Sequence, residues 1–189
     1  AFMGHKDDSS DIYIIDLNSN EITNITNDIF SESSPSWSPN GKIIYFTSDR
    51  GENINANNMF DVDFSQTDIF QYSLESDAVS QLTNTEYNEN YPVADSDGNL
   101  YYTADYNGIT NIFRHDLINN EAFPITNVIT GVQQIDLDNN NHLVFIDDHI
   151  NRLFESAKGI SLDIPFSKTE IINQISKVLL KNNMKDGVH

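Results

Sequence analysis

Short apolar runs separated by polar turn residues recur along much of the chain. One run, Asp11 to Leu17, reads Asp-Ile-Tyr-Ile-Ile-Asp-Leu, and related runs begin at Asp68 and Asn111. Runs of this length, rich in Ile, Tyr and Phe and bounded by Asn, Asp and Gly, predict β-strands. The run at Asp11 is apolar on both faces, which suits a strand covered on both sides.

These runs belong to a repeat with fixed internal spacing. A threonine preceded by Ile or Leu and followed by Asn recurs at the same offset from each start, at Thr26, Thr83 and Thr126. A turn residue recurs at the same offset again beyond each threonine, at Gly41, Gly98 and Asn141. Each turn residue precedes another apolar run, and the last of these predicts a strand over 142–146. Asn-Gly and Asp-Gly supply the positive φ of tight hairpins, which Asn141 tolerates.

The length of the repeat predicts its architecture. The stretch from Gly41 to Asp68 is about twice as long as the equivalent stretch from Gly98 to Asn111, and one polar insertion, near 51–66, accounts for the difference. We expect that insertion to be a surface loop. Without it the period is about 43 residues, the length of a four-stranded propeller blade. The fold class is therefore mainly β: a partial β-propeller of about three and a half four-stranded antiparallel blades. A two-layer sandwich is the alternative, but it does not explain the constant offsets.

A family resemblance rests on residues 36–50, which read Ser-Trp-Ser-Pro-Asn-Gly-Lys-Ile-Ile-Tyr-Phe-Thr-Ser-Asp-Arg. This stretch, the Asp-Ile-Tyr strand and the Leu-Thr-Asn step resemble the TolB-type (WD-like) propeller repeat. The resemblance covers about 1–146 in three copies. The second turn departs from it, because residues 94–97 read Ala-Asp-Ser-Asp. Such repeats imply a binding platform and no particular reaction.

The pattern changes after residue 146. Apolar residues at helical spacing, Ile150, Leu153, Phe154 and Ala157, predict a helix with Asp148 as N-cap and Gly159 as the C′ residue. Residues 167–170, Ser-Lys-Thr-Glu, form a capping box for a second helix. Its apolar stripe is Ile171, Ile175, Val178 and Leu179. We therefore expect two domains, a propeller part at 1–146 and a helical tail at 147–189.

The tail carries a second resemblance. Residues 148–158, Asp-His-Ile-Asn-Arg-Leu-Phe-Glu-Ser-Ala-Lys, are similar to a stretch of the small domain of fold-type IV pyridoxal-phosphate aminotransferases, which include the branched-chain amino acid aminotransferases. The resemblance covers about 147–187. It implies that Arg152 contacts the cofactor phosphate, a role suited to a guanidinium. The family's Schiff-base lysine has no counterpart here, since Lys158 and Lys168 are not at its position. We therefore expect no cofactor, and Arg152 as a solvated helix residue. A natural fusion, an assembly artefact and chance each explain the junction.

The net charge of the chain restricts the classes of partner that it can bind. The chain has 29 acidic and 10 basic residues, a net charge of −19. This excess argues against nucleic acid and anionic membrane surfaces. No apolar run reaches the roughly 20 residues that cross a bilayer, so we expect no membrane insertion. Cysteine is absent, which removes disulfides and thiolate chemistry.

Catalytic signatures are scarce. The sequence has no G-x-S-x-G, no H-E-x-x-H and no phosphate-binding glycine loop. One calcium candidate has EF-hand-like spacing: Asp136, Asp138, Asn140 and Asp147. Position 6 of that pattern is Asn rather than Gly, and position 12 is Asp rather than Glu, so a polar hairpin turn is the favoured interpretation. We predict no catalytic residues.

The sequence therefore favours a non-catalytic propeller scaffold that binds a protein or peptide and belongs to a periplasmic or extracellular protein. The alternative is a fragment of an enzyme, either the propeller of a serine peptidase or part of a branched-chain aminotransferase. Propellers close with 4 to 8 blades. Closure here needs more chain, a second copy, or capping by the tail helices.

Overall fold

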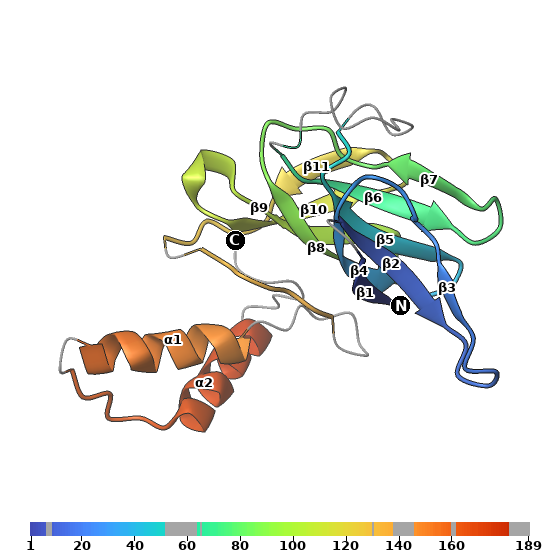
Figure 1. Ribbon diagram of the computed structural model, residues 1–189. Helices are drawn as coiled ribbons and strands as arrows, with labels where there is room; N and C mark the ends of the chain where they lie inside the picture. Colours follow the sequence, from blue (N-terminus) through green and yellow to red (C-terminus); the bar gives the residue numbers. More distant parts are fainter. Residues whose placement is uncertain are drawn as a thin grey trace. The chain divides into compact units, whose positions relative to one another are not determined.

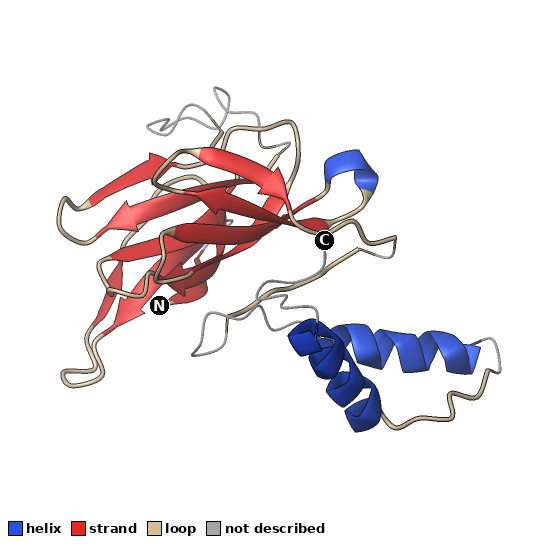
Figure 2. Cartoon of the chain, turned by 180° about the vertical axis from the view of Figure 1, so that it is seen from behind, coloured by secondary structure: helices blue, strands red, loops and turns tan. Residues whose placement is uncertain are grey.

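The computed structural model describes residues 1–6, 9–51, 64, 66–129, 131–137, 146–159 and 162–181 (Figure 1). The chain divides into two compact units, Ala1–Ile135 and Asp136–His189. The first unit is built of strands and the second contains two helices (Figure 2). The insertion at 52–63 and 65, the predicted turn at Asn141 and the predicted strand residues 142–145 lie outside the described part of the chain.

Three antiparallel sheets make up the first unit, and we call them blades 1, 2 and 3. Blade 1 has the order β1 (Phe2–Lys6), β2 (Ser9–Ile15), β3 (Ile22–Asn24). Blade 2 has the order β4 (Glu32–Trp37), β5 (Ile43–Ser48), β6 (Asp68–Ser73), β7 (Ala78–Gln81). Blade 3 comprises β8 (Glu89–Ala94), β9 (Asn99–Ala104), β10 (Asn111–Asp116) and β11 (Glu121–Pro124), with a short 3-10 turn, η2 (Tyr106–Gly108), between β9 and β10. The predicted fold class is confirmed.

Two apolar layers join the three blades. Ile12 of β2 packs with buried residues of β5 and β6 between blades 1 and 2: Ile44, Phe46, Phe70 and Tyr72. A second layer joins blades 2 and 3 and contains Tyr45, Ile69, Leu100, Tyr102 and Ala104. Blade 2 is therefore apolar on both faces, as the sequence predicted for strands that lie between neighbouring sheets.

The threonine of each repeat closes its blade. The Oγ1 atom of Thr26 accepts a hydrogen bond from the backbone N–H of Ile12 at 2.9 Å. Thr83 accepts the equivalent bond from Ile69 at 2.8 Å, and Thr126 accepts one from Ile112 at 2.9 Å. The fixed spacing in the sequence thus reflects one hydrogen bond that each blade repeats. The threonine follows the outermost strand of its blade, and the N–H that it accepts from lies in the neighbouring strand.

The turns follow the predicted chemistry. Gly41 and Gly98 have φ of 68° and 90°, which confirms that each supplies a left-handed turn residue. Ser34 in β4 and Tyr91 in β8 also have positive φ, 52° and 55°. Both lie where the register shifts between the first and second strands of their blades. The repeat therefore includes a β-bulge that the sequence pattern did not reveal.

The helical unit contains α1 (Ile146–Gly159) and α2 (Lys168–Lys181). The capping box is confirmed: the Ser167 N–H donates to Glu170 Oε2 at 2.8 Å, and the Glu170 N–H donates to Ser167 Oγ at 3.2 Å.

Three details of the predicted first helix were wrong. Ile146 opens α1 instead of ending a strand, so Asp148 lies inside the first turn rather than at the N-cap. Gly159 belongs to α1 and does not have positive φ.

None of the helices described is long and apolar enough to cross a membrane.

Candidate functional site

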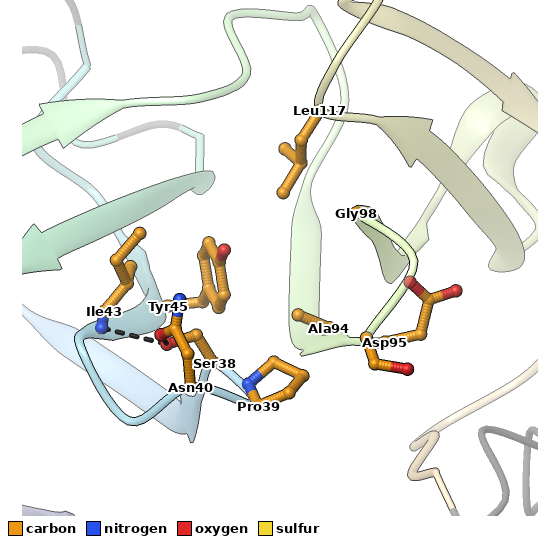
Figure 3. A pocket seen from close by; sticks show the side chains of 10 residues that line it. Ser38, Pro39, Asn40, Ile43, Tyr45, Ala94, Asp95, Gly98 and Leu117 are labelled. Carbon is orange, nitrogen blue, oxygen red and sulfur yellow. Dashed lines mark hydrogen bonds between the residues drawn. The ribbon is translucent and has the colours of Figure 1, made fainter.

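A pocket of about 360 Å³ lies between blades 2 and 3 (Figure 3). Residues 38–40, in the turn between β4 and β5, form one wall, together with Ile43 and Tyr45. The other wall lies at the end of β8 and in the turn before β9, and it is formed by Ala94, Asp95, Ser96 and Gly98 together with Leu117. A pocket of this volume lies within the range of small-ligand or side-chain sites.

Hydrogen bonds fix the first wall. The Ser38 hydroxyl accepts from the Ile43 N–H at 2.9 Å and donates to Asn40 Oδ1 at 2.8 Å. Asn40 Oδ1 also accepts from the Lys42 N–H at 3.0 Å. Because the turn is held by its own side chains, it forms a preorganised edge of the pocket. Pro39 adds a constrained apolar surface at the same turn.

Asp95 fixes the second wall. Its carboxylate accepts from the backbone N–H groups of Asp97 and Asn99 at 2.9 and 2.8 Å, from the Asn99 side chain at 2.7 Å, and from the Tyr101 hydroxyl at 3.2 Å. Asp95 thus takes the place that Ser38 holds in blade 2. Residues 94–97 differ from the TolB-like turn sequence, but the turn is still held by a side chain of its own. The Asp95 carboxylate has a structural role in this turn.

The lining is mixed in character. Ile43, Ala94 and Leu117 are half-buried and apolar, and Tyr45 is only 4% exposed. The Leu117 N–H donates to the Gly98 carbonyl at 3.0 Å, which holds this side chain over the pocket. Burial raises the pKa of Tyr45 above that of an exposed tyrosine. These walls therefore combine apolar side chains with hydrogen-bonded turns.

The opposite end of the blades holds buried charge. Arg50 is 2% exposed, and its guanidinium lies 2.6 Å from Glu32 Oε1 and 3.2 Å from Asp28 Oδ2. The Phe30 ring lies 4.9 Å from the guanidinium carbon. Burial raises the pKa of Glu32 to about 7, and the attraction of Arg50 opposes that rise. Arg50 thus bridges two carboxylates, while Glu32 Oε2 has no hydrogen-bond partner among the described residues.

Glu89 occupies the matching position in blade 3 without the arginine. It is 1% exposed, and its Oε1 accepts a hydrogen bond from the Thr85 hydroxyl at 3.1 Å. Its Oε2 has no hydrogen-bond partner among the described residues. Burial raises the pKa of Glu89 to about 7, and the nearby Asp68 adds to the rise.

The candidate ligands predicted from sequence do not assemble in the described part of the chain. Asp136 is exposed and accepts a hydrogen bond from the Leu137 N–H at 2.8 Å. Asp147 lies in α1, while Asp138 and Asn140 fall outside the described residues. Among the residues described, no group of three acidic or histidine side chains could hold a metal ion. The favoured interpretation of this stretch as a polar hairpin turn stays a prediction, because Asp138 and Asn140 lie outside the described residues.

Arg152, the residue that the aminotransferase resemblance assigns to a cofactor phosphate, lies in α1, but its side chain is outside what the structure describes. Two of the five lysines of the tail were compared in the sequence with the Schiff-base lysine of that family. Lys158 is exposed in the last turn of α1, and the Lys168 ammonium lies 5.5 Å above the Phe154 ring. The role of Arg152 under the aminotransferase resemblance therefore stays a prediction.

The pocket was missed in the sequence because it lies between two repeats. The available signal was the pair of turns at Asn40-Gly41 and Asp97-Gly98, which the repeat places on adjacent blades. Trp37, the tryptophan of the TolB-like stretch, is 39% exposed at the end of β4 and does not line the pocket.

No family model matches the chain. Among curated proteins, it is 30% identical over 76 residues to a branched-chain-amino-acid aminotransferase from Methanocaldococcus jannaschii, a match that covers 40% of this chain and 23% of the relative. It is 35% identical over 57 residues to the D-alanine aminotransferase of Bacillus licheniformis, covering 30% of this chain and 20% of the relative. The chain thus shares partial similarity with aminotransferases and spans less than a quarter of their length.

Solved structures resemble the strand-rich part. A TolB-type protein from Agrobacterium tumefaciens matches 66% of this chain and 43% of its own, with 20% identity and a TM-score of 0.54. TolB from Acinetobacter baumannii matches 76% of this chain and 34% of its own, with 21% identity and a TM-score of 0.55. Hydrazine synthase from Kuenenia stuttgartiensis matches 71% of this chain and 24% of its own, with 12% identity and a TM-score of 0.54. The chain therefore contains three blades with the fold of TolB-type β-propellers, and it spans under half of those proteins.

Proposed function

We propose that the chain is a non-catalytic binding module, in which the propeller part, residues 1–146, engages a protein or peptide of the cell envelope or of the extracellular space. The tail, residues 147–189, is a segment of aminotransferase-like origin in this proposal. The observation that carries it is the pocket between blades 2 and 3, whose two walls are held rigid by their own side-chain hydrogen bonds. A preorganised edge of this kind lowers the ordering cost of binding.

The chemistry of the pocket and of its surroundings defines the partner. The apolar lining from Ile43, Ala94 and Leu117 takes one bulky apolar or aromatic side chain. Residues 1–146 contain 23 acidic and 4 basic residues, so lysines or arginines beside that side chain gain favourable attraction. The expected partner is an extended basic peptide segment with one apolar anchor.

Selection from a library of short random displayed peptides tests this proposal. We expect enriched sequences to combine an aromatic or large aliphatic residue with flanking Lys or Arg, and their affinity to fall as salt rises. Ser96→Trp places a large ring at the pocket mouth and should abolish binding. Ser19→Trp, in the exposed β2–β3 turn, is the matched control and should bind normally. Absence of enrichment, or equal binding by both variants, contradicts the proposal.

A second candidate follows from the partial similarity to aminotransferases. In that case the chain is a fragment of an enzyme that uses pyridoxal phosphate. We expect the chain to retain no cofactor absorbance band after incubation with pyridoxal phosphate and dialysis, because a stable bond requires a correctly placed lysine. A retained band that is lost in Arg152→Ala would favour the enzyme fragment over the binding module.

A further inference from the structure

One position of the repeat holds a basic residue in blades 1 and 2 but not in blade 3. The position lies two residues beyond a strand residue that pairs with an Asp or Asn near the start of the next strand: Gly4 with Asp11, Ser48 with Asp68, and Ala104 with Asn111. This position is Lys6 in blade 1, Arg50 in blade 2 and Tyr106 in blade 3. Blade 3 therefore carries a tyrosine where the other two blades carry a cation.

In blade 2 this cation is enclosed by carboxylates and aromatic rings. The Arg50 guanidinium lies 2.6 Å from Glu32 Oε1 and 3.2 Å from Asp28 Oδ2. Three rings have their centroids 4.9, 5.8 and 5.4 Å from the guanidinium carbon: Phe30, Phe46 and Phe70. A guanidinium is planar, presents forked donors and stacks on aromatic rings, so this arrangement is suited to arginine.

Blade 3 keeps the carboxylate and the rings of this arrangement. Glu89 begins β8 as Glu32 begins β4, and both glutamates are almost fully buried. Tyr106 packs edge-on against two rings, with centroids 4.8 and 6.3 Å from its own: Tyr87 and Phe113. In the repeat these two rings correspond to Phe30 and Phe70. Tyr106 thus lies among the rings as Arg50 does, but it brings no positive charge to Glu89.

The carboxylate of Glu89 is buried without a paired cation in the described part of the chain. Among the described residues, no basic side chain forms an ion pair with Glu89. Its Oε2 also lacks a hydrogen-bond partner there, as does Glu32 Oε2, so the two sites differ in the guanidinium that Glu32 Oε1 contacts. Burial of an unpaired carboxylate costs free energy that a bound cation would offset. Glu89 is therefore an acceptor for a cation that blade 3 does not supply.

Tyr106 differs from Arg50 in its exposure, and this difference gives a route to the carboxylate. Tyr106 is 43% exposed, whereas Arg50 is 2% exposed. Tyr106 also belongs to the short turn η2 and not to a strand. Exposed side chains change rotamer within nanoseconds. Rotation of the Tyr106 side chain toward solvent would therefore free the place among Tyr87, Phe113 and Glu89.

We propose that this end of blade 3 binds the guanidinium group of an arginine on a partner chain, which takes among Glu89, Tyr87 and Phe113 the place that Arg50 holds in blade 2. A lysine fits less well, because its ammonium group is compact and more strongly hydrated than a guanidinium. The site lies at the end of the blades opposite to the pocket between blades 2 and 3. It is therefore independent of the peptide site proposed there.

Titration of the full chain with N-acetyl-arginine amide, followed through backbone amide signals in NMR spectra, tests the site. At pH 8 the Glu89 carboxyl, whose pKa burial raises to about 7, is charged. We expect saturable shifts of the Glu89 and Thr85 amides and none at Ser38 in the pocket. N-acetyl-citrulline amide has the same shape without the charge and should cause no saturable shift. Glu89→Gln should weaken binding about ten-fold or more, whereas Glu86→Gln, at an exposed neighbour, should bind as the wild type does.

Filling the site from within the chain provides an independent test. Tyr106→Arg restores the residue type of blade 2, so it should abolish the response to N-acetyl-arginine amide. Ile109→Arg adds the same charge at an exposed residue between η2 and β10 and should keep the response. Ser96→Trp, which blocks the pocket, should also keep it, so the two proposals can fail separately. No saturable shift in the wild type, equal binding of the citrulline compound, or unchanged binding by Glu89→Gln or Tyr106→Arg would overturn the proposal.

Discussion

Two glutamates show how one residue position is treated differently in successive repeats. Glu32 and Glu89 are both almost fully buried at the start of the first strand of their blades. Arg50, which follows β5 in blade 2, forms an ion pair with Glu32. The equivalent position in blade 3, after β9, belongs to the short turn η2 and holds no arginine. Glu89 receives a hydroxyl hydrogen bond instead, and burial makes the charged form of both glutamates costly, raising the pKa of each to about 7. In the next repeat the position is Val132, which avoids the buried charge altogether.

Glu89 should therefore make the stability of the propeller unit fall as pH rises. Its pKa in the folded state is about 7, above the usual value of 4.5, so folding favours the protonated form. The resulting stabilisation is complete below about pH 4.5 and is lost as pH rises through about 7, a change of roughly 3 kcal/mol. We expect Glu89→Gln to be more stable than the wild type at pH 8, by on the order of 1–3 kcal/mol, and nearly equal to it at pH 4.

Urea unfolding at several pH values measures this difference. Glu86→Gln, which changes a nearby exposed glutamate, is the control and should follow the wild-type profile. A difference between Glu89→Gln and the wild type that does not change between pH 4 and pH 8 would show that the Glu89 carboxyl titrates normally in the folded state.

The repeated threonine supports a second prediction at this scale. Thr83→Val keeps the side-chain shape but leaves the buried Ile69 N–H without its acceptor. An unsatisfied buried donor costs about 1–3 kcal/mol, so the free energy of unfolding should fall by that amount. Thr83→Ser retains the hydroxyl and should lose less. Chemical denaturation of the two variants decides, and equal losses would mean that the hydrogen bond contributes nothing.

At the scale of elements, the first strands of blades 2 and 3 contain backbone strain. Ser34 has φ of 52° in the middle of β4, a conformation that glycine adopts without a Cβ penalty. We expect Ser34→Gly to raise the free energy of unfolding by about 0.5–1 kcal/mol. Ser33→Gly, at a neighbouring residue without positive φ, should lower it. Thermal denaturation of this pair tests the prediction, and a loss of stability in both variants would contradict it.

The same bulge is a feature of the fold that the sequence did not predict. The strands, the hairpin glycines and the capping box were predictable, because each follows from residues close together in the chain. The bulge was not, because Ser34 and Tyr91 share no side-chain preference for positive φ. The pocket was not predictable either, because its walls come from two successive repeats. The start of α1 at Ile146 was missed because a short apolar run suits a strand as well as a helix.

At the scale of the whole molecule, the composition separates two parts. Residues 1–146 have 23 acidic and 4 basic residues, whereas 147–189 have 6 of each. The first part has a layered apolar core, and the second contains two helices with Leu153 and Phe166 exposed. The two parts therefore differ in charge as well as in secondary structure.

Truncation after Asp147 should therefore leave the propeller unit folded and nearly unchanged in stability. Burial of a large apolar side chain contributes roughly 1.5–3 kcal/mol, so removal of a true cap with several such residues would lower the melting temperature by many degrees. The first unit has its own apolar layers, so we expect the melting temperature of the truncated chain to lie within about 2 °C of that of the full chain. Differential scanning calorimetry of both chains at equal concentration makes the comparison. Aggregation, or a large fall in melting temperature, would show instead that the helices stabilise the blades.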